Sequence, residues 1–80
     1  MAGISAVETI GDRVRVMRQR RGIRQGELAQ RIHASANAIN MLEVGLITNP
    51  HADRIVALAQ ALECSADYLL GLSEDPRARE

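Results

Sequence analysis

The sequence has no tryptophan and no phenylalanine, and Tyr68 is its single aromatic residue. Its apolar residues are mostly alanine, leucine, isoleucine and valine. Any core must therefore be aliphatic, which favours a compact helical bundle over a β-sandwich. A chain of 80 residues makes one small domain, near the lower limit for independent folding.

Cysteine is almost absent, with Cys64 as the single thiol. One cysteine excludes an internal disulfide framework and fits a reducing cytoplasm. A thiol nucleophile would need a base, and no pattern brings His33 or His51 to Cys64. We therefore expect Cys64 to be a buried structural residue, since a free cysteine packs as a small hydrophobe.

Long apolar runs and catalytic motifs are also missing. No stretch approaches the roughly 20 apolar residues that a membrane span requires, and the first residues, "MAGISAVET", lack the pattern of a signal peptide. The sequence has no Cys/His cluster of metal-site spacing, no Ser/His/Asp arrangement and no glycine-rich phosphate loop. We therefore expect no enzyme, no metal, no cofactor and no small-molecule site.

Lysine is absent, so all ten basic residues are arginine, and the net charge is zero. The charge is nevertheless polarised. Residues 1–40 hold seven arginines and three acids, a net charge of +4, and residues 41–80 hold three arginines and seven acids, a net charge of −4. Such a molecule can present a basic face to nucleic acid while it stays neutral overall. The alternative is a set of solvated, arginine-rich helix faces.

Apolar spacing predicts five helices. Ile10, Val14 and Met17 form one stripe, with Arg13, Arg20 and Arg21 outside it. Ser35 and Ser65 are typical N-caps. The predicted helices cover residues 6–21, 25–32, 36–44, a stretch from Asn49 or His51 to 62, and 66–71. The predicted domain organisation is a flexible N-terminus (1–5), a helical domain (6–72) and a flexible polar tail (73–80).

The second and third predicted helices, with the short break between them, form a distinct unit. Ala29 is small where the helices must cross closely, and Ile39 and Leu42 wedge the pair against the core. Two short helices joined in this way leave the outer face of the second helix free to enter a groove about 12 Å wide.

The chain resembles the Cro/repressor-type helix-turn-helix family, also called XRE, over about residues 10–72. The resemblance rests on residues that match jointly and in register: Gly22, Gln25, Leu28, Ala29, Ser35, Ile39, Glu43, Gly45, Ala59, Leu62 and "SADYLL". It implies a compact, all-α, five-helix lambda-repressor-like fold. It also implies a cytoplasmic, sequence-specific transcriptional regulator, a repressor, that binds a two-fold operator of double-stranded DNA as a homodimer.

The resemblance also implies roles for individual residues. Base edges would be met by Ala36, Asn37, Asn40 and Met41. Phosphates would be met by Gln25, Ser35, Thr48 and Asn49. Arg18 and Glu43 match a pair that forms an internal salt bridge, which would hold the third helix at a set angle. The alternative is an exposed ion pair that contributes only about 0–1 kcal/mol to stability. The dimer surface would lie around Tyr68, Leu69, Leu72 and the loop near Leu46.

The chain departs from the family pattern at several positions. His33 stands in place of the usual turn glycine, and Arg24 in place of the usual Ser or Thr cap. The reading face carries no arginine, so Asn37 and Asn40 would supply its hydrogen bonds, for which adenine is the expected base. Phosphate attraction then falls to "RQRRGIRQG" and its neighbours: Arg20, Arg21, Arg24 and Arg31.

Leu46 and Ile47 stand where members of the family often carry a basic residue. They either cover the core beneath their loop or make a subunit contact beside the DNA. This apolar loop, the neutral third helix and the zero net charge also motivate an alternative function. In that alternative the chain is a protein-interaction or antitoxin-like module that keeps the fold without binding DNA.

Overall fold

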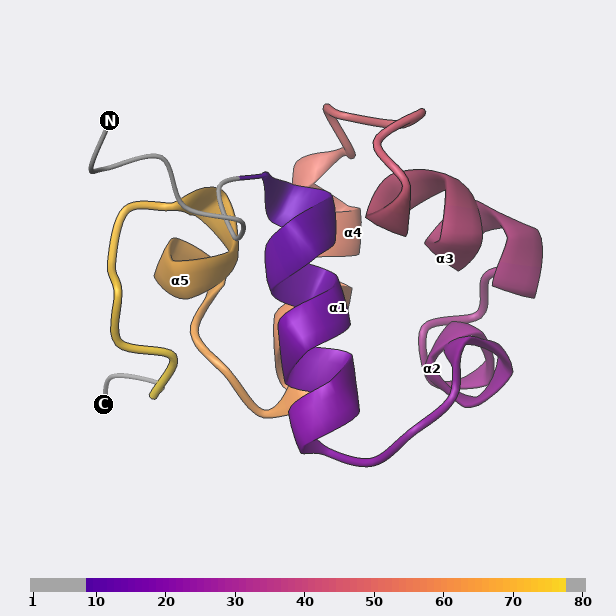
Figure 1. Cartoon of the computed structure of the whole chain (residues 1–80), viewed down its shortest axis with the longest axis horizontal. Helices are drawn as coiled ribbons and strands as arrows, with labels where there is room; N and C mark the ends of the chain where they lie inside the picture. Colours follow the sequence, from indigo (N-terminus) through magenta and orange to yellow (C-terminus); the bar gives the residue numbers. More distant parts are fainter. Residues whose placement is uncertain (1–8, 78–80) are drawn as a thin grey trace.

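The computed structural model describes residues 9–77, and these form five α-helices and no strand (Figure 1). The all-α class predicted from the sequence is confirmed. The helices are α1 (Ile10–Arg20), α2 (Gln25–Arg31), α3 (Ala36–Glu43), α4 (Ala52–Leu62) and α5 (Ala66–Leu70).

Most helix boundaries lie within one residue of the prediction, and the first helix is the exception. Thr9 has an extended backbone and its hydroxyl accepts a hydrogen bond from Asp12 N at 3.0 Å, so α1 begins at Ile10. The predicted helical residues 6–8 and the predicted flexible residues 1–5 lie outside the described residues. His51 is the N-cap of α4, and Pro50 precedes that helix.

The two predicted serine caps are confirmed. Ser35 Oγ accepts from Ala38 N at 3.1 Å at the start of α3, and Ser65 Oγ accepts from Tyr68 N at 3.0 Å at the start of α5. Each hydroxyl satisfies one main-chain donor that the first turn of a helix leaves without a partner. The two short helices therefore have starting points fixed by sequence.

The core is aliphatic, as the composition predicts. α1 runs through the middle of the molecule, with α2 and α3 on one side of it and α5 on the other (Figure 1). The largest fully buried side chains come from all five helices: Val14, Met17, Leu28, Ile39, Leu58, Leu62 and Leu69. This core fixes the α2–α3 pair against α1.

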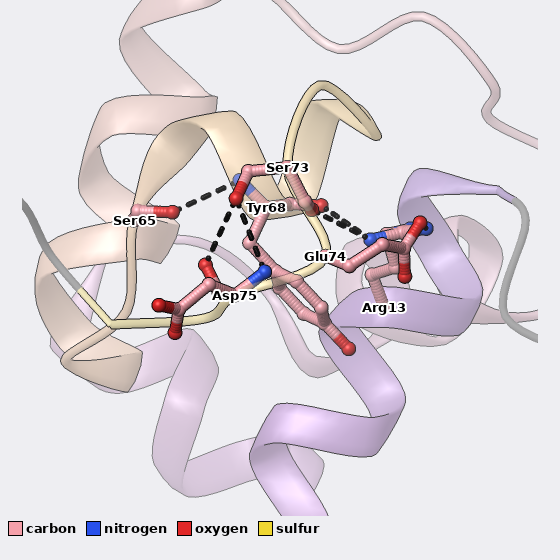
Figure 2. Close-up of polar contacts among 6 residues, drawn as sticks. All are labelled: Arg13, Ser65, Tyr68, Ser73, Glu74 and Asp75. Carbon is pink, nitrogen blue, oxygen red and sulfur yellow. Dashed lines mark hydrogen bonds and ion pairs between the residues drawn. The ribbon is translucent and has the colours of Figure 1, made fainter.

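Arg13 is buried, although it lies off the apolar stripe of α1. Its guanidinium lies over the Tyr68 ring, 4.7 Å from the centroid. One nitrogen donates to the carbonyl oxygens of Tyr68 (3.0 Å) and Ser73 (3.3 Å), and the other pairs with Glu74 at 3.1 Å (Figure 2). The ring and the carbonyls compensate the desolvation of the charge.

These contacts hold part of the predicted flexible tail (73–80) against the domain. Residues 73–77 fold back on the domain through Arg13 and through Ser65, whose N–H donates to the carbonyl of Pro76 at 2.8 Å. The sequence offered no apolar anchor here, and main-chain carbonyls supply the anchorage instead. Residues 78–80 lie outside the described residues.

Two of the three residues of the predicted dimer surface are buried within the single chain. Tyr68 lies beneath Arg13, and Leu69 lies in the core. Leu72, which follows α5, is 75% exposed and remains available.

Cys64 is buried, as expected of a structural cysteine. Burial raises the pKa of its thiol above the usual value, and the charge of Arg21 offsets part of that rise. Among residues 9–77, none of the helices has the length and apolar character needed to cross a membrane.

Candidate nucleic-acid interface

The turn between α2 and α3 has the left-handed backbone that glycine favours, and a histidine adopts it. His33 has φ of +58°. Two main-chain hydrogen bonds close the turn, from Ala34 N to Ala29 O at 2.8 Å and from His33 N to Gln30 O at 3.3 Å. Histidine is among the residues that tolerate this conformation best, so the departure from glycine leaves the helix-turn-helix intact.

The two faces of α3 have opposite characters. Ile39, Leu42 and Glu43 are buried against the rest of the molecule. The predicted reading residues lie on the other face, where Ala36, Asn37 and Asn40 are exposed and Met41 is half-buried. The helix is therefore fixed along one side and offers a neutral, hydrogen-bonding surface along the other.

The Glu43 carboxylate joins three elements at the end of α3. Arg18 Nε donates to Glu43 Oε2 at 2.7 Å and Arg18 Nη2 donates to Oε1 at 3.0 Å. Gln25 Nε2 donates to the same Oε1 at 3.0 Å. The Glu43 side chain is 3% exposed, so the pair is a buried ion pair and the alternative of a weak surface pair does not apply. Bonding to Glu43 raises the pKa of Arg18 above its usual value, against the effect of burial.

A glycine that the sequence reasoning did not single out allows α1 to approach α3. A Cβ placed on Gly11 would overlap the carbonyl oxygen of Leu42. Arg15 Nη1 also donates to the carbonyl of Glu43 at 3.1 Å. A glycine inside a predicted helix was the available signal, because glycine is unfavourable there without a packing reason.

Gln25 stands at the first position of α2, where the resemblance predicts a phosphate contact. Its side-chain amide nitrogen donates to Glu43 Oε1 and, at 3.5 Å, to Asn40 Oδ1. The side-chain donors are therefore engaged inside the protein. The main-chain N–H of Gln25, in the first helical turn, is the group left to meet a phosphate.

Most arginines of the basic half are engaged within the protein. Arg13, Arg15, Arg18 and Arg31 form ion pairs with acidic side chains. Arg20 and Arg24 are exposed and make no ion pair with any residue from 9 to 77. Arg24 stands at the N-cap of α2 and its side chain does not cap that helix.

Arg21, a predicted phosphate contact, is hydrogen-bonded to the end of α4. Its Nε donates to the carbonyl of Leu62 and its Nη2 to the carbonyl of Glu63, both at 2.7 Å. Glu63 is the left-handed C-cap of α4, where carbonyls lack helical partners and the helix dipole is negative. The guanidinium of Arg21 therefore stabilises the end of α4.

Arg54 is a candidate phosphate ligand that the sequence reasoning missed. It lies on α4 and makes no ion pair among the described residues. It lines a pocket of about 300 Å³ together with Ala38 and Leu42 of α3 and with Asn49 and His51. Arg54 has no other arginine near it in the sequence and so gave no charge-run signal, and only the fold places it beside α3.

The remaining predicted contacts lie on the surface. Ser35, Thr48 and Asn49 are exposed. The two residues of the apolar loop separate, because Ile47 packs on the core and Leu46 is 76% exposed. Ile47 therefore covers the core, and Leu46 is the residue left for a contact outside the chain. Within residues 9–77, no three His, Cys, Asp or Glu side chains gather where they could hold a metal ion.

Comparison with known proteins gives three findings. A family model described as helix-turn-helix matches residues 14–69. Repressor protein C2 of Salmonella phage P22 is 38% identical over 63 residues, which are 79% of this chain and 29% of that protein. The chain thus spans about 29% of the length of this curated relative.

Two solved structures of the P22 c2 repressor are also similar. The first is a crystal structure in complex with a synthetic operator, with a TM-score of 0.76, 35% identity, and coverage of 82% of this chain and 98% of the other. The second is a solution structure of the DNA-binding domain, with the same TM-score and identity and coverage of 88% and 93%. The predicted lambda-repressor-like fold is confirmed by these matches.

Proposed function

This chain belongs to the helix-turn-helix family, and we propose that it is a sequence-specific transcriptional regulator of double-stranded DNA, a repressor that binds a two-fold operator as a homodimer in the cytoplasm. The observation that carries the proposal is the division of α3. Its inner side is fixed by buried Ile39, Leu42 and Glu43, and its outer side presents Ala36, Asn37 and Asn40 to solvent.

The outer face of α3 suits the major groove. That groove is about 12 Å wide, admits an α-helix, and presents a distinct pattern of donors and acceptors for each base pair. Asn37 and Asn40 supply hydrogen-bonding groups, and Ala36 and Met41 supply apolar contact, for example to a thymine methyl. We assign base readout to these four residues.

Three arginines whose side chains form no ion pair or hydrogen bond within residues 9–77 supply the phosphate contacts. Arg20 and Arg24 lie at the end of α1 and the start of α2, and Arg54 lies by the α3–α4 loop. The other protein groups that we propose to contact phosphate are the main-chain N–H of Gln25 and the polar groups of Ser35, Thr48 and Asn49. So few charges give weak binding from one copy, which is why the proposal includes two copies with half-sites about 34 Å apart.

The test is a selection of bound sequences from a random duplex pool with the purified chain, followed by salt titrations of binding to random duplex. The expected result is a two-fold site with half-sites one helical turn apart. Binding to random duplex should weaken steeply as salt rises, because phosphate contacts release counterions. Absence of duplex binding at low salt with micromolar protein would overturn the proposal.

One observation favours the alternative function, a protein-interaction or antitoxin-like module. Leu46 and Val44 are exposed at the end of α3, close in sequence to Ile47 and Pro50, which help to line the pocket beside α3. An exposed apolar patch rimmed by polar residues is typical of a protein-binding surface. The same salt titration separates the two functions, because an interaction module of this kind has no affinity for random duplex.

A further inference from the structure

A chain of hydrogen bonds runs from the buried ion pair to the reading face. Arg18 donates to Glu43, Gln25 Nε2 donates to Glu43 Oε1 at 3.0 Å, and the same Nε2 donates to Asn40 Oδ1 at 3.5 Å. Asn40 is exposed on the outer face of α3, whereas Glu43 is buried on its inner face. The chain therefore links a fixed internal charge to one of the side chains assigned to base readout.

The chemistry of the chain sets the direction of each bond. An ionised carboxylate only accepts hydrogen bonds, so the atom that Gln25 turns to Glu43 must be its amide nitrogen. That nitrogen carries two hydrogens, and the second points to Asn40. Asn40 accepts this bond with its carbonyl oxygen, and its Nδ2 hydrogens have no hydrogen-bond partner within residues 9–77.

We propose that Gln25 fixes Asn40 as a hydrogen-bond donor toward DNA, so that Asn40 selects a keto base, guanine or thymine, and disfavours adenine and cytosine. The inference rests on the proposed function. In the major groove guanine offers two acceptors, O6 and N7, and thymine offers O4, whereas adenine has its N7 acceptor beside the N6 donor and cytosine has only the N4 donor. A donor amide therefore has no acceptor on cytosine, and on adenine it can use N7 alone, next to an amino donor that it cannot satisfy.

This inference replaces adenine as the base expected for Asn40, whereas adenine remains the base expected for Asn37. Paired recognition of adenine needs both the amide oxygen and the amide nitrogen of one asparagine, and the oxygen of Asn40 faces Gln25. The side chain of Asn37 makes no hydrogen bond within the described part of the chain, so it is free to take either orientation. Gln25 is thus a positioning residue, which acts on the DNA sequence preference through Asn40.

The test compares sequence selections from random duplex by the unmodified chain and by variants. Asn40→Ala identifies the base position that depends on Asn40. At that position the unmodified chain should prefer a keto base about tenfold, within the range of one good base contact. Gln25→Ala should reduce this preference below about threefold and leave the preference at the Asn37-dependent position unchanged. Gln30→Ala, an exposed glutamine on the same helix, is the matched control and should change neither.

Asn40→Asp gives a second, independent result. A carboxylate only accepts, so this variant should invert the preference to adenine or cytosine. It keeps the inference testable if Gln25→Ala fails to fold. Each of three results would overturn the inference alone. The unmodified chain could select adenine at the Asn40-dependent position, or Gln25→Ala could leave the keto preference intact. The third result is a folded Asn40→Asp variant whose base preference does not invert. Failure of the unmodified chain to select any site would overturn the proposed function as well.

Discussion

Arg18 binds Glu43 side-on, with Nε and Nη2 meeting the two carboxylate oxygens at 2.7 and 3.0 Å. This pair joins α1 to the last residue of α3 and lies mostly out of solvent. Removal of one partner would leave a buried charge without compensation. The position of α3 therefore depends on a residue buried on its inner side.

Arg18→Met should lower the free energy of unfolding by about 3 kcal/mol, because an uncompensated buried carboxylate remains. The double variant Arg18→Met with Glu43→Leu should lose less than the sum of the two single variants. Urea denaturation of the four proteins measures this coupling. Additive losses would mean that the ion pair contributes no coupling energy.

The contact between Gly11 and Leu42 gives a prediction with an internal control. Gly11→Ala places a methyl group against a main-chain carbonyl that cannot rotate away. It should therefore destabilise the protein by about 2 kcal/mol, within the range of overpacked sites. Gly26→Ala, also on a helix but with open space around the added Cβ, should stabilise by up to about 1 kcal/mol.

Thermal unfolding followed by circular dichroism compares the two alanine variants. The contact between α1 and α3 would have no energetic role if Gly11→Ala were as stable as Gly26→Ala. Binding of the selected operator by Gly11→Ala should also weaken, because the added methyl group displaces the end of α3.

Local sequence signals predicted the helices. The serines that cap α3 and α5 and the apolar stripes of α1 and α4 act within one or two turns, so their effects are readable from spacing. The reading residues were named by the family resemblance; Ala36, Asn37 and Asn40 are exposed on α3, and their base contacts stay a prediction.

Features that depend on distant residues could not be predicted in this way. Arg13, Arg21 and Arg54 look alike in the sequence, yet one is buried under the tail, one caps α4 and one is free beside α3. Their separation depends on which carbonyls and acids the fold brings near them. The burial of Tyr68 and Leu69 was not readable for the same reason, since it depends on how α5 packs in the fold.

Arg13→Met should release residues 73–77 from the domain. The carbonyls of Tyr68 and Ser73 would lose their donor, and the free energy of unfolding should fall by about 2 kcal/mol. Glu74→Gln should change it by less than about 0.5 kcal/mol, because an exposed partner contributes little. Amide hydrogen exchange at Ser65, whose N–H is bonded to Pro76, reports on the release. Unchanged protection there in Arg13→Met would contradict the role given to Arg13.

Cys64 should resist thiol reagents in the folded protein. Burial raises the pKa of its thiol, so the folded state disfavours the reactive thiolate. The free energy of unfolding should therefore fall as the pH rises from the pKa of this thiol in the unfolded chain toward its higher pKa in the folded chain. At pH 8 alkylation should be at least about a hundredfold slower than in denaturant, where the thiol titrates near 8.5. Equal rates with and without denaturant would show that the thiol is exposed.

The central claim, that α3 reads base sequence while the arginines before it bind phosphate, is tested most directly by titrating a selected operator and a random duplex with two variants. Asn37→Ala should weaken operator binding by about 1–3 kcal/mol and leave binding to random duplex almost unchanged. Arg24→Ala should weaken both duplexes alike and reduce the salt dependence of binding. Equal losses on operator and random duplex for Asn37→Ala would contradict the account.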